Sequence, residues 1–222
     1  MKVTLLSEPQ HGGVLTEFFS GHPTIELVTS GAELVIDCLY FDLEEKYTSL
    51  QSFESKDAIL ISNTLTAPAT SIARNIGGFK RIIGVPMISS QLASQKTIEY
   101  STPLQQQDMT SNGELLKSLF RKDVEKIGDC VAGIFPRTIA MIINEAAFAL
   151  QEQVATASDI DMAMKLGTNY PKGPLAWCDE IGTYTIVAIL EALQIEYGAD
   201  RYKVAPLLRL NAEAGKKFFD VQ

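Results

Sequence analysis

The sequence predicts an α/β domain followed by an all-helical domain. In the first half, short apolar runs typical of buried strands alternate with helix-compatible segments, which indicates a parallel sheet covered on both faces. In the second half, apolar residues recur at helical spacing between helix-capping residues. We therefore predict a small, truncated, doubly wound α/β domain over residues 1–110 and a helical bundle over residues 111–222.

The first half divides into strands joined by short helices. The strongest strand signal is the apolar run Leu-Val-Ile-Asp-Cys-Leu-Tyr, which ends at residue 40. The predicted strands are Lys2–Leu6, Ile25–Thr29, Glu33–Tyr40, Ala58–Ser62 and Arg81–Val85. The predicted helices are Gly13–Ser20, Leu43–Phe53 and Ala67–Ile76. Pro103 and the polar run at 105–107 are assigned to the connection between the two halves.

The residues from about 112 onward are predicted to be wholly helical. A wide apolar stripe over Ile134–Val154 indicates a central, largely buried helix. A capping box of Thr156 and Asp159 begins the next helix, which Gly167 would end. The remaining predicted helices are Thr183–Tyr197, which Gly198 stops, and a last helix from Pro206 to Gly215.

Residues 166–182, Leu-Gly-Thr-Asn-Tyr-Pro-Lys-Gly-Pro-Leu-Ala-Trp-Cys-Asp-Glu-Ile-Gly, form a predicted corner between two helices. The Gly-Pro pair at 173–174 fits the first turn of a short helix. We expect Trp177 to bury its ring against its neighbours and to contact Tyr170. Asp179 and Glu180 are expected to face solvent. No nucleophile or base with a partner occurs here, so the corner is predicted to be structural.

Composition and charge narrow the class of protein. The chain has 222 residues, 46% of them hydrophobic and 21% charged, as in an ordinary globular protein. Its formal net charge of −8 argues against nucleic acid as a partner. Apolar runs fall short of the roughly 18 residues of a membrane span, and the N-terminal run is too short for a signal peptide. Three separated cysteines without a CxxC pair predict neither zinc nor disulfides, and favour a cytoplasmic location.

The turn after the first strand does not carry a dinucleotide-binding signature. Such a turn would read GxGxxG, so that the backbone approaches the pyrophosphate at a helix N-terminus. The sequence over 7–13 is instead Ser-Glu-Pro-Gln-His-Gly-Gly, and Glu8 would repel phosphate. The second strand also lacks the acidic residue that would hold a ribose, since Thr-Ser-Gly follows at 29–31.

Neither histidine is predicted to be a catalytic residue. Only His11 and His22 occur, each in a segment predicted to be a loop or turn, and both are interpreted as solvated loop residues. Neither belongs to a Ser-His-Asp or Cys-His arrangement, and metal-ligand spacings are not found in the sequence. A catalytic base must therefore be sought elsewhere.

The segment RTIAMIINEAAFALQEQVATASDIDMAMKLGTNYPKGPLAW closely resembles the C-terminal helical domain of 3-hydroxyacyl-CoA dehydrogenases, including bacterial 3-hydroxybutyryl-CoA dehydrogenases. It combines an Asn-Glu-Ala helix, an Asp-Ile-Asp-x-Ala-Met helix and an Asn-Tyr-Pro-x-Gly-Pro turn in the family's order. The resemblance covers residues 134–220. More weakly, AELVIDCLYFDLEEK and DAILISNTLTAPATSIA are similar to the family's NAD-binding domain, which implies a reduced Rossmann-like fold and NAD as the cofactor.

The chain departs from the family at its active site. The family has a catalytic histidine in a Gly-Leu-His-Phe context, and Gly-Val-Pro-Met at 84–87 puts Pro86 in that position. The glutamate that pairs with this histidine corresponds to Glu99, if one residue is inserted. A family asparagine that contacts substrate before an arginine corresponds to Pro136. Only about 30 residues precede the Val-Ile-Asp of the third strand, where the family has two βαβ units.

Other site residues match the family. Ser62, Asn63 and Thr64 correspond to its polar site residues, which implies substrate binding. Since proline cannot accept the hydroxyl proton, the chain is predicted to be a dimerising, substrate-domain unit of fatty-acid or related acyl-CoA metabolism that lacks a complete hydride-transfer site. Its expected partners are a second copy, bound through the helical domain, and another acyl-CoA enzyme.

Two alternatives stay open. The chain could be a working NAD-dependent 3-hydroxyacyl-CoA dehydrogenase that uses Glu99 or another base. It could instead be a non-catalytic module that binds CoA esters, whose phosphates require a basic cluster. The candidate pairs for that cluster are Lys80-Arg81, Arg121-Lys122 and Lys216-Lys217.

Overall fold

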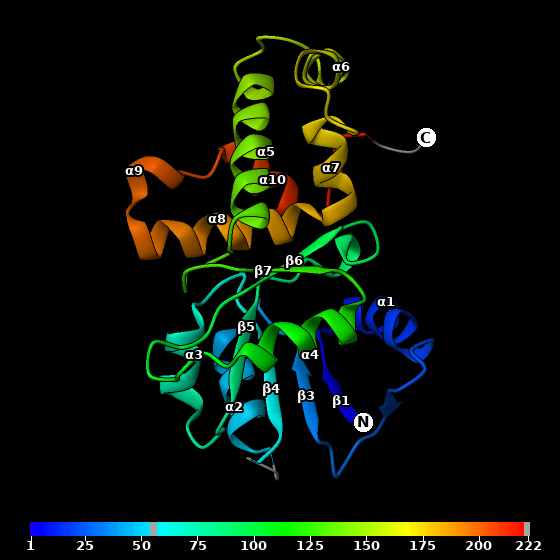
Figure 1. Ribbon diagram of the computed structural model, residues 1–222. Helices are drawn as coiled ribbons and strands as arrows, with labels where there is room; N and C mark the ends of the chain where they lie inside the picture. The colour runs from blue at the N-terminus through cyan, green and yellow to red at the C-terminus, as the bar shows by residue number, and fades with distance from the viewer. Residues whose placement is uncertain (54–56, 220–222) are drawn as a thin grey trace. The chain divides into compact units, whose positions relative to one another are not determined.

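The computed structural model describes residues 1–53 and 57–219. Its contacts divide the chain into two units, Met1–Gly133 and Ile134–Gln222 (Figure 1). The α/β plus all-helical fold class is confirmed, but the division falls after Gly133 and not after the predicted residue 110. The reason is that α4 (Thr110–Phe120) and β7 (Asp123–Lys126) pack with the sheet unit. Residue 220, where the family resemblance ends, lies outside the described residues.

A parallel sheet forms the centre of the first unit. Its strand order is β2-β1-β3-β4-β5, and every pair within it is parallel. The strands are β1 (Lys2–Leu6), β2 (Glu26–Leu27), β3 (Leu34–Asp37), β4 (Ile59–Asn63) and β5 (Ile82–Val85). The chain leaves β1 toward one side and continues from β3 toward the other. Their carboxyl ends therefore meet at a topological switch point, where ligands of such sheets bind.

Both faces of this sheet are covered, as the apolar runs predicted. Successive residues of β3 alternate, so Leu34 and Ile36 face one core while Val35 faces the other. The first core contains α1 (Pro9–Ser20) and α4, and the second contains α2 (Leu43–Gln51) and α3 (Ala69–Ile76). Strands buried on both sides explain why the sequence pattern is continuous and not alternating.

Element boundaries differ from the predictions where local chemistry decides them. Helix α1 begins four residues earlier than predicted, at Pro9, because proline suits the first helical position. Strand β2 has only two residues. Helix α2 begins as predicted, and the Asp42 carboxylate caps it by accepting from the N–H groups of Glu44 and Glu45, at 2.9 and 3.0 Å.

A second, two-stranded sheet was not predicted. Strand β6 (Thr97–Tyr100) runs parallel to β7, and Ser101 forms an antiparallel bridge with Gly84 of β5. Between β5 and β6 lies η1, a short 3-10 helix over Ser89–Gln91. The prediction that residues from about 112 onward are wholly helical is therefore wrong for β7. Every residue of β7 is exposed or half-buried, so the strand shows no apolar pattern.

The second unit is helical. Its elements are α5 (Phe135–Gln151), α6 (Ala157–Thr168), α7 (Pro174–Ile181), α8 (Thr183–Tyr197), α9 (Ala199–Tyr202) and α10 (Pro206–Glu213). The predicted Thr156 cap is confirmed, since its hydroxyl accepts from the Asp159 N–H at 3.2 Å. Gly167 does not end α6, because the helix continues to Thr168 and Asn169 adopts the left-handed conformation. Within the described ranges, no helix is both long and apolar enough to cross a membrane.

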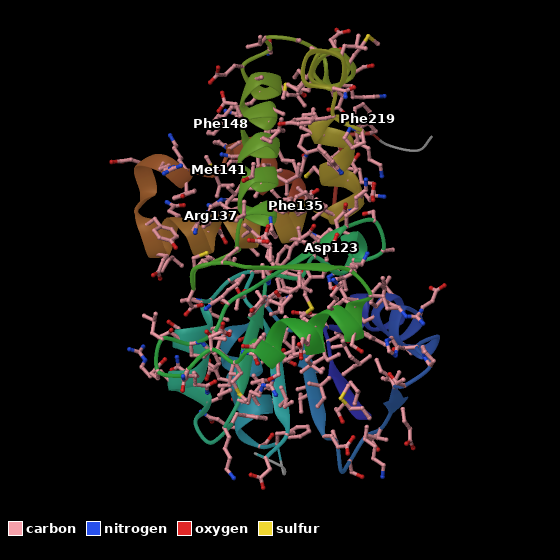
Figure 2. The ribbon with its side chains drawn as sticks, viewed as in Figure 1. Asp123, Phe135, Arg137, Met141, Phe148 and Phe219 are labelled. Carbon is pink, nitrogen blue, oxygen red and sulfur yellow. The ribbon has the colours of Figure 1, made fainter. Side chains whose placement is uncertain are left out.

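The corner at 166–182 is largely as predicted. Helix α7 begins at Pro174, and the half-buried Trp177 lies against Tyr170 with their ring centroids 5.8 Å apart. Asp179 is a correction: its carboxylate accepts from the N–H groups of Phe218 and Phe219, each at 2.8 Å, so it holds the C-terminal segment. Phe219 is labelled in Figure 2 beside α7. Glu180 is exposed and forms an ion pair with Lys172.

Candidate functional site

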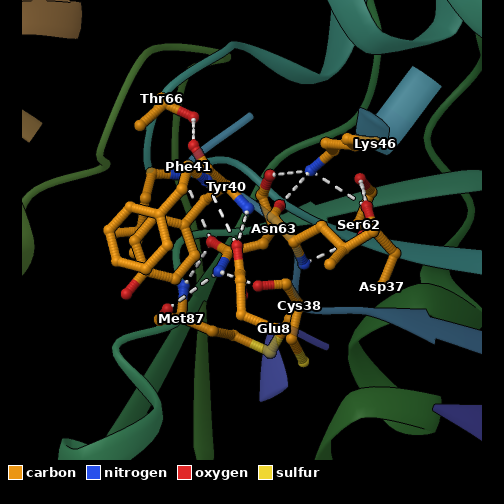
Figure 3. A network of polar contacts seen from close by, with 12 residues as sticks. Glu8, Asp37, Cys38, Tyr40, Phe41, Lys46, Ser62, Asn63, Thr66 and Met87 are labelled. Carbon is orange, nitrogen blue, oxygen red and sulfur yellow. Dashed lines mark hydrogen bonds and ion pairs between the residues drawn. The ribbon is translucent and has the colours of Figure 1, made fainter. Parts of the chain in front are cut away.

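Polar side chains gather at the carboxyl edge of the parallel sheet. Glu8 follows β1, Asp37 ends β3, and Asn63 ends β4. Because the strands are parallel, these residues meet at one edge, and Figure 3 shows them joined in a single network. This edge is the place where an α/β sheet of this kind would bind a ligand.

The centre of the network is a fully buried ion pair. Lys46 of α2 places its Nζ 2.9 Å from Oδ2 of Asp37, and the Ser62 hydroxyl donates to the same oxygen at 2.5 Å. Lys46 also donates to the carbonyls of Leu39 and Asn63, at 2.9 and 2.6 Å. Burial raises the pKa of Asp37, while the charge of Lys46 opposes that rise. Through its contacts with Asp37 and two backbone carbonyls, Lys46 holds the ends of the strands together.

Asn63 joins the ends of three strands. Its amide nitrogen donates to the carbonyls of Met87 and Cys38, at 2.9 and 3.4 Å. Its amide oxygen accepts from the N–H groups of Leu65 and Met87, at 3.2 and 3.0 Å. These four bonds use both donors and both acceptor positions of a carboxamide. Asn63 is therefore fully engaged by the protein itself.

The three predicted substrate-binding residues thus lie together at the carboxyl edge, but inside the protein. Ser62 and Asn63 are fully buried, and Thr64 is 1% exposed. The backbone of Thr64 is also occupied: its N–H donates to Val85 and its carbonyl accepts from Ala132, at 3.2 and 2.8 Å. Their contacts are those of residues that shape the edge, and their predicted role in substrate binding stays a prediction.

Glu8 occupies the turn between β1 and α1. It is the residue before the first helical position, and its Oε1 accepts from the N–H groups of Tyr40 and Phe41, at 2.7 and 3.2 Å. Glu8 is only 9% exposed. The carboxylate therefore places a negative charge at the N-terminus of α1, at the position where a dinucleotide-binding turn would offer N–H groups to phosphate.

The prediction that His11 is a solvated loop residue is wrong. It lies in the first turn of α1, is half-buried, and its Nε2 is 3.0 Å from the Tyr40 hydroxyl. Burial lowers the pKa of His11, while the nearby charge of Glu8 works in the opposite direction. The sequence analysis missed the Glu8, His11 and Tyr40 cluster. The Glu-x-x-His spacing at a proline helix start was the available local signal, whereas Tyr40 is distant in sequence.

His22 is a structural residue. Its Nδ1 accepts from the Thr24 N–H at 3.3 Å, and its Nε2 lies 3.0 Å from the Ser118 carbonyl. These contacts occupy both ring nitrogens of His22. Among the described residues, no group of three or more histidine, cysteine or acidic side chains could hold a metal ion.

Pro86 and Glu99 lie next to each other. Gly133, at φ +59°, packs so closely that a methyl group on its Cα would collide with the Glu99 carboxylate and with Pro86 Cγ, the latter at 2.6 Å. The two side chains therefore flank one point in space although they are far apart in sequence. The structure brings Pro86 and Glu99 together, and their correspondence to the family's histidine and glutamate stays a prediction.

Comparison with known proteins identifies the family of this chain. The family model for the 3-hydroxyacyl-CoA dehydrogenase C-terminal domain matches residues 134–218. A probable 3-hydroxybutyryl-CoA dehydrogenase of Bacillus subtilis is 30% identical over 202 residues, which cover 86% of this chain and 70% of the relative. The chain belongs to the 3-hydroxyacyl-CoA dehydrogenase family. The 3-hydroxyadipyl-CoA dehydrogenase of Escherichia coli is 39% identical over 168 residues, and the match spans 72% of this chain but only 32% of that protein.

Solved structures show the same fold. FadB2 of M. tuberculosis superposes with a TM-score of 0.83 at 18% identity, covering 99% of this chain and 98% of that chain. The (S)-3-hydroxybutyryl-CoA dehydrogenase PaaH1 of Ralstonia eutropha superposes with a TM-score of 0.75 at 23% identity, covering 96% and 94%. At these identities the likeness establishes the fold of this 3-hydroxyacyl-CoA dehydrogenase family member.

The family motifs in the helical unit have structural roles. Asn144, from the Asn-Glu-Ala motif, donates to the Lys203 carbonyl and accepts from the Ala205 N–H, at 2.9 and 2.8 Å. Asp161, from the Asp-Ile-Asp motif, accepts from the N–H groups of Leu175 and Ala176 in the first turn of α7, at 2.8 and 2.9 Å. In this chain Asn144 holds the segment before α10, and Asp161 holds the first turn of α7.

NAD, the cofactor that the resemblance implies, does not fit the turn after β1. A pyrophosphate at the N-terminus of α1 would meet the carboxylate of Glu8, and the first turn begins with Pro9, which has no N–H to offer. Tyr40 and Phe41 already give their N–H groups to Glu8. The side chains at this position therefore repel phosphate and do not cradle it.

Proposed function

We propose that this family member does not transfer hydride itself and acts as a dimerising, substrate-domain unit in acyl-CoA metabolism. The observation that carries the proposal is the buried carboxylate of Glu8, held by the N–H groups of Tyr40 and Phe41 at the start of α1. A negative charge at this point opposes binding of a pyrophosphate.

The position of the base supports the same proposal. Oxidation of a 3-hydroxyl group requires a base that takes the hydroxyl proton while the carbon loses hydride. Pro86 has no proton-accepting atom, although Glu99 is in place beside it. Loss of a general base costs roughly 10²- to 10⁴-fold in rate, in addition to the effect of a poor cofactor site.

The helical unit supports a role in assembly. It carries large apolar side chains that are more than half exposed, and such side chains mark a partner-binding surface where they form one patch. These are Ile134, Val154, Met162, Leu166, Tyr184, Ile195 and Leu210. We propose that a second copy covers part of this surface and that another acyl-CoA enzyme is a further partner. A cytoplasmic location is proposed because the three cysteines are far apart in the sequence and form no CxxC pair.

Calorimetry with NADH and with acetoacetyl-CoA, measured separately, tests the proposal. We expect no NADH binding up to about 1 mM, which corresponds to a binding free energy weaker than roughly −4 kcal/mol. Light scattering should give the mass of a dimer. Submillimolar NADH binding together with turnover of acetoacetyl-CoA would refute the proposal, and a monomer at all concentrations would refute the assembly role.

One observation favours a working dehydrogenase as the alternative. Glu99 flanks the same point as Pro86, so a carboxylate is available where the family's histidine would act. If Glu99 is the base, Glu99→Gln removes all turnover while acetoacetyl-CoA binding persists. Absence of turnover in the unmodified protein excludes this alternative.

A further inference from the structure

A basic hollow lies on the first unit, away from the residues of the carboxyl-edge network. It has a volume of roughly 630 Å³, within the usual range of ligand sites. Four cations line it: Lys96, which directly precedes β6, and Lys117, Arg121 and Lys122 at the end of α4. The single acidic lining residue is Asp123, labelled in Figure 2. This concentration of positive charge contrasts with the net charge of −8 of the chain.

The positive charge of the hollow is not neutralised by the protein. Within residues 1–53 and 57–219, none of the four cations forms an ion pair with a carboxylate. Lys122 donates to the carbonyls of Ala93, at 3.3 Å, and of Gln95, which hold its ammonium group in place without cancelling its charge. An anion in the hollow would therefore meet the held ammonium group of Lys122 with three exposed cations around it.

A second hollow adjoins the first and has a different chemistry. It measures roughly 320 Å³ and shares Arg121 and Lys122 with the basic hollow. Its other lining side chains include Phe18, His22 and Phe120. Contacts with Thr24 and Ser118 hold the imidazole of His22, and Phe18 packs against Phe120 with ring centroids 6.3 Å apart. The half-buried rings of Phe18 and His22 thus lie next to a cationic cluster, while the ring of Phe120 is buried.

We propose that the two hollows form one site for a nucleotide. Its phosphates bind the cations of the basic hollow, and its base enters the aromatic hollow, with Arg121 and Lys122 at the junction. Phosphate oxygens are the preferred partners of clustered lysine and arginine, and a planar base gains from contact with aromatic rings. The site shares no residue with the turn after β1, so it is independent of whether NAD binds there.

Helix electrostatics account for only part of this cluster. Cations at the end of α4 are favoured by the helix dipole, which would explain Lys117, Arg121 and Lys122 without a ligand. Lys96 comes from a different segment, directly before β6, and it lines the same hollow. Arg121 also adopts the left-handed conformation at φ 56°, which is unfavourable for a residue with a Cβ.

Calorimetry with ADP, pyrophosphate and adenosine on the full chain tests the proposal. We expect ADP to bind submillimolar at low salt, at least tenfold more tightly than either pyrophosphate or adenosine, because only ADP fills both hollows. The double variant Lys96→Glu/Lys117→Glu should weaken ADP binding at least tenfold. Phe18→Leu should weaken ADP binding but leave pyrophosphate binding unchanged.

Lys165→Glu/Lys203→Glu is the matched control, because it makes the same change in net charge on exposed residues of the other unit. It should leave ADP affinity within about twofold. The proposal is overturned if ADP does not bind at about 5 mM, if pyrophosphate binds as tightly as ADP, or if the control weakens ADP binding as much as the Lys96 and Lys117 variant does. Circular dichroism confirms that each variant is folded.

Discussion

The carboxylate of Glu8 accepts a hydrogen bond of 2.7 Å from the backbone N–H of Tyr40, and so joins the end of β1 to the segment after β3. The same oxygen accepts from Phe41 at 3.2 Å. The Glu8 carboxylate therefore occupies backbone N–H groups at the edge of the sheet where a dinucleotide would bind. It is a structural link, and under the proposed function it is also the feature that opposes binding of a dinucleotide.

Removal of this link should destabilise the first unit. Glu8→Ala leaves two backbone N–H groups without their acceptor, so the free energy of unfolding should fall by about 1–3 kcal/mol in urea denaturation. Glu8→Gln keeps an oxygen at the same position and should cost less. Glu17→Ala, at an exposed position of α1, is the control. Equal unfolding midpoints for Glu8→Ala and Glu17→Ala would contradict the structural role.

Loss of the buried ion pair between Lys46 and Asp37 should lower the free energy of unfolding far more than loss of a surface ion pair. Lys46→Met leaves the Asp37 carboxylate buried without its cation, which should lower the free energy of unfolding by about 3–5 kcal/mol at neutral pH. Lys80→Met is the matched control, because Lys80 and Asp57 form an ion pair with both side chains largely exposed. The control should unfold almost like the unmodified protein.

The pH dependence of the Lys46→Met variant follows from the pKa of Asp37. Burial already raises this pKa above 3.8, and loss of Lys46 should raise it further. A folded state that holds this proton more tightly than the unfolded state loses stability as pH rises above the unfolded pKa. The loss in free energy of unfolding caused by Lys46→Met should therefore be smaller at pH 4 than at pH 7. An equal loss at both pH values would argue against a charged Asp37 as its cause.

Pro86→His should recreate a histidine–carboxylate pair. Because Glu99 flanks Pro86 over Gly133, an imidazole at this position would lie close to the carboxylate. The negative charge should raise the imidazole pKa above its ordinary value of about 6.5, which an NMR titration measures. In Pro86→His/Glu99→Gln this rise should disappear. The same imidazole pKa in both variants would show that the two side chains do not interact.

More of the fold than of the site could be predicted from the sequence, because buried strands leave a local pattern and contacts between distant residues do not. The strands of the main sheet are buried on both faces, so Leu34, Val35 and Ile36 form a visible apolar run. Strand β7 leaves no such trace, because its residues are exposed or half-buried. The contact between His11 and Tyr40 joins residues 29 apart in sequence, and no local pattern specifies it.

The three cysteines should differ sharply in reactivity. Cys38 and Cys178 are fully buried, and burial raises the pKa of Cys178 to about 12, whereas Cys130 is half-buried. A buried thiol with this pKa is almost wholly protonated near neutral pH and does not attack disulfide reagents. One thiol should therefore react rapidly with Ellman's reagent at pH 8, and Cys130→Ser should abolish this phase. A rapid phase that survives in Cys130→Ser would contradict the burial of the other two.

Gly133 provides a test of how tightly Pro86 and Glu99 are packed. Gly133 and Gly31 both have positive φ, at +59° and +67°, so alanine strains the backbone similarly at each. At Gly31 the added methyl group meets nothing within 4 Å, but at Gly133 it meets both Glu99 and Pro86. Gly133→Ala should therefore lower the free energy of unfolding by about 1–3 kcal/mol more than Gly31→Ala, because only the first adds a steric collision.

A double variant assigns that difference to the collision. Glu99→Ala removes one of the two groups that the new methyl meets, so Gly133→Ala should cost less in the Glu99→Ala background than in the unmodified protein. The coupling free energy from urea denaturation of all four proteins measures the contact directly. If the two substitutions are additive, Glu99 does not lie against Gly133, and the neighbour relationship between Glu99 and Pro86 fails with it.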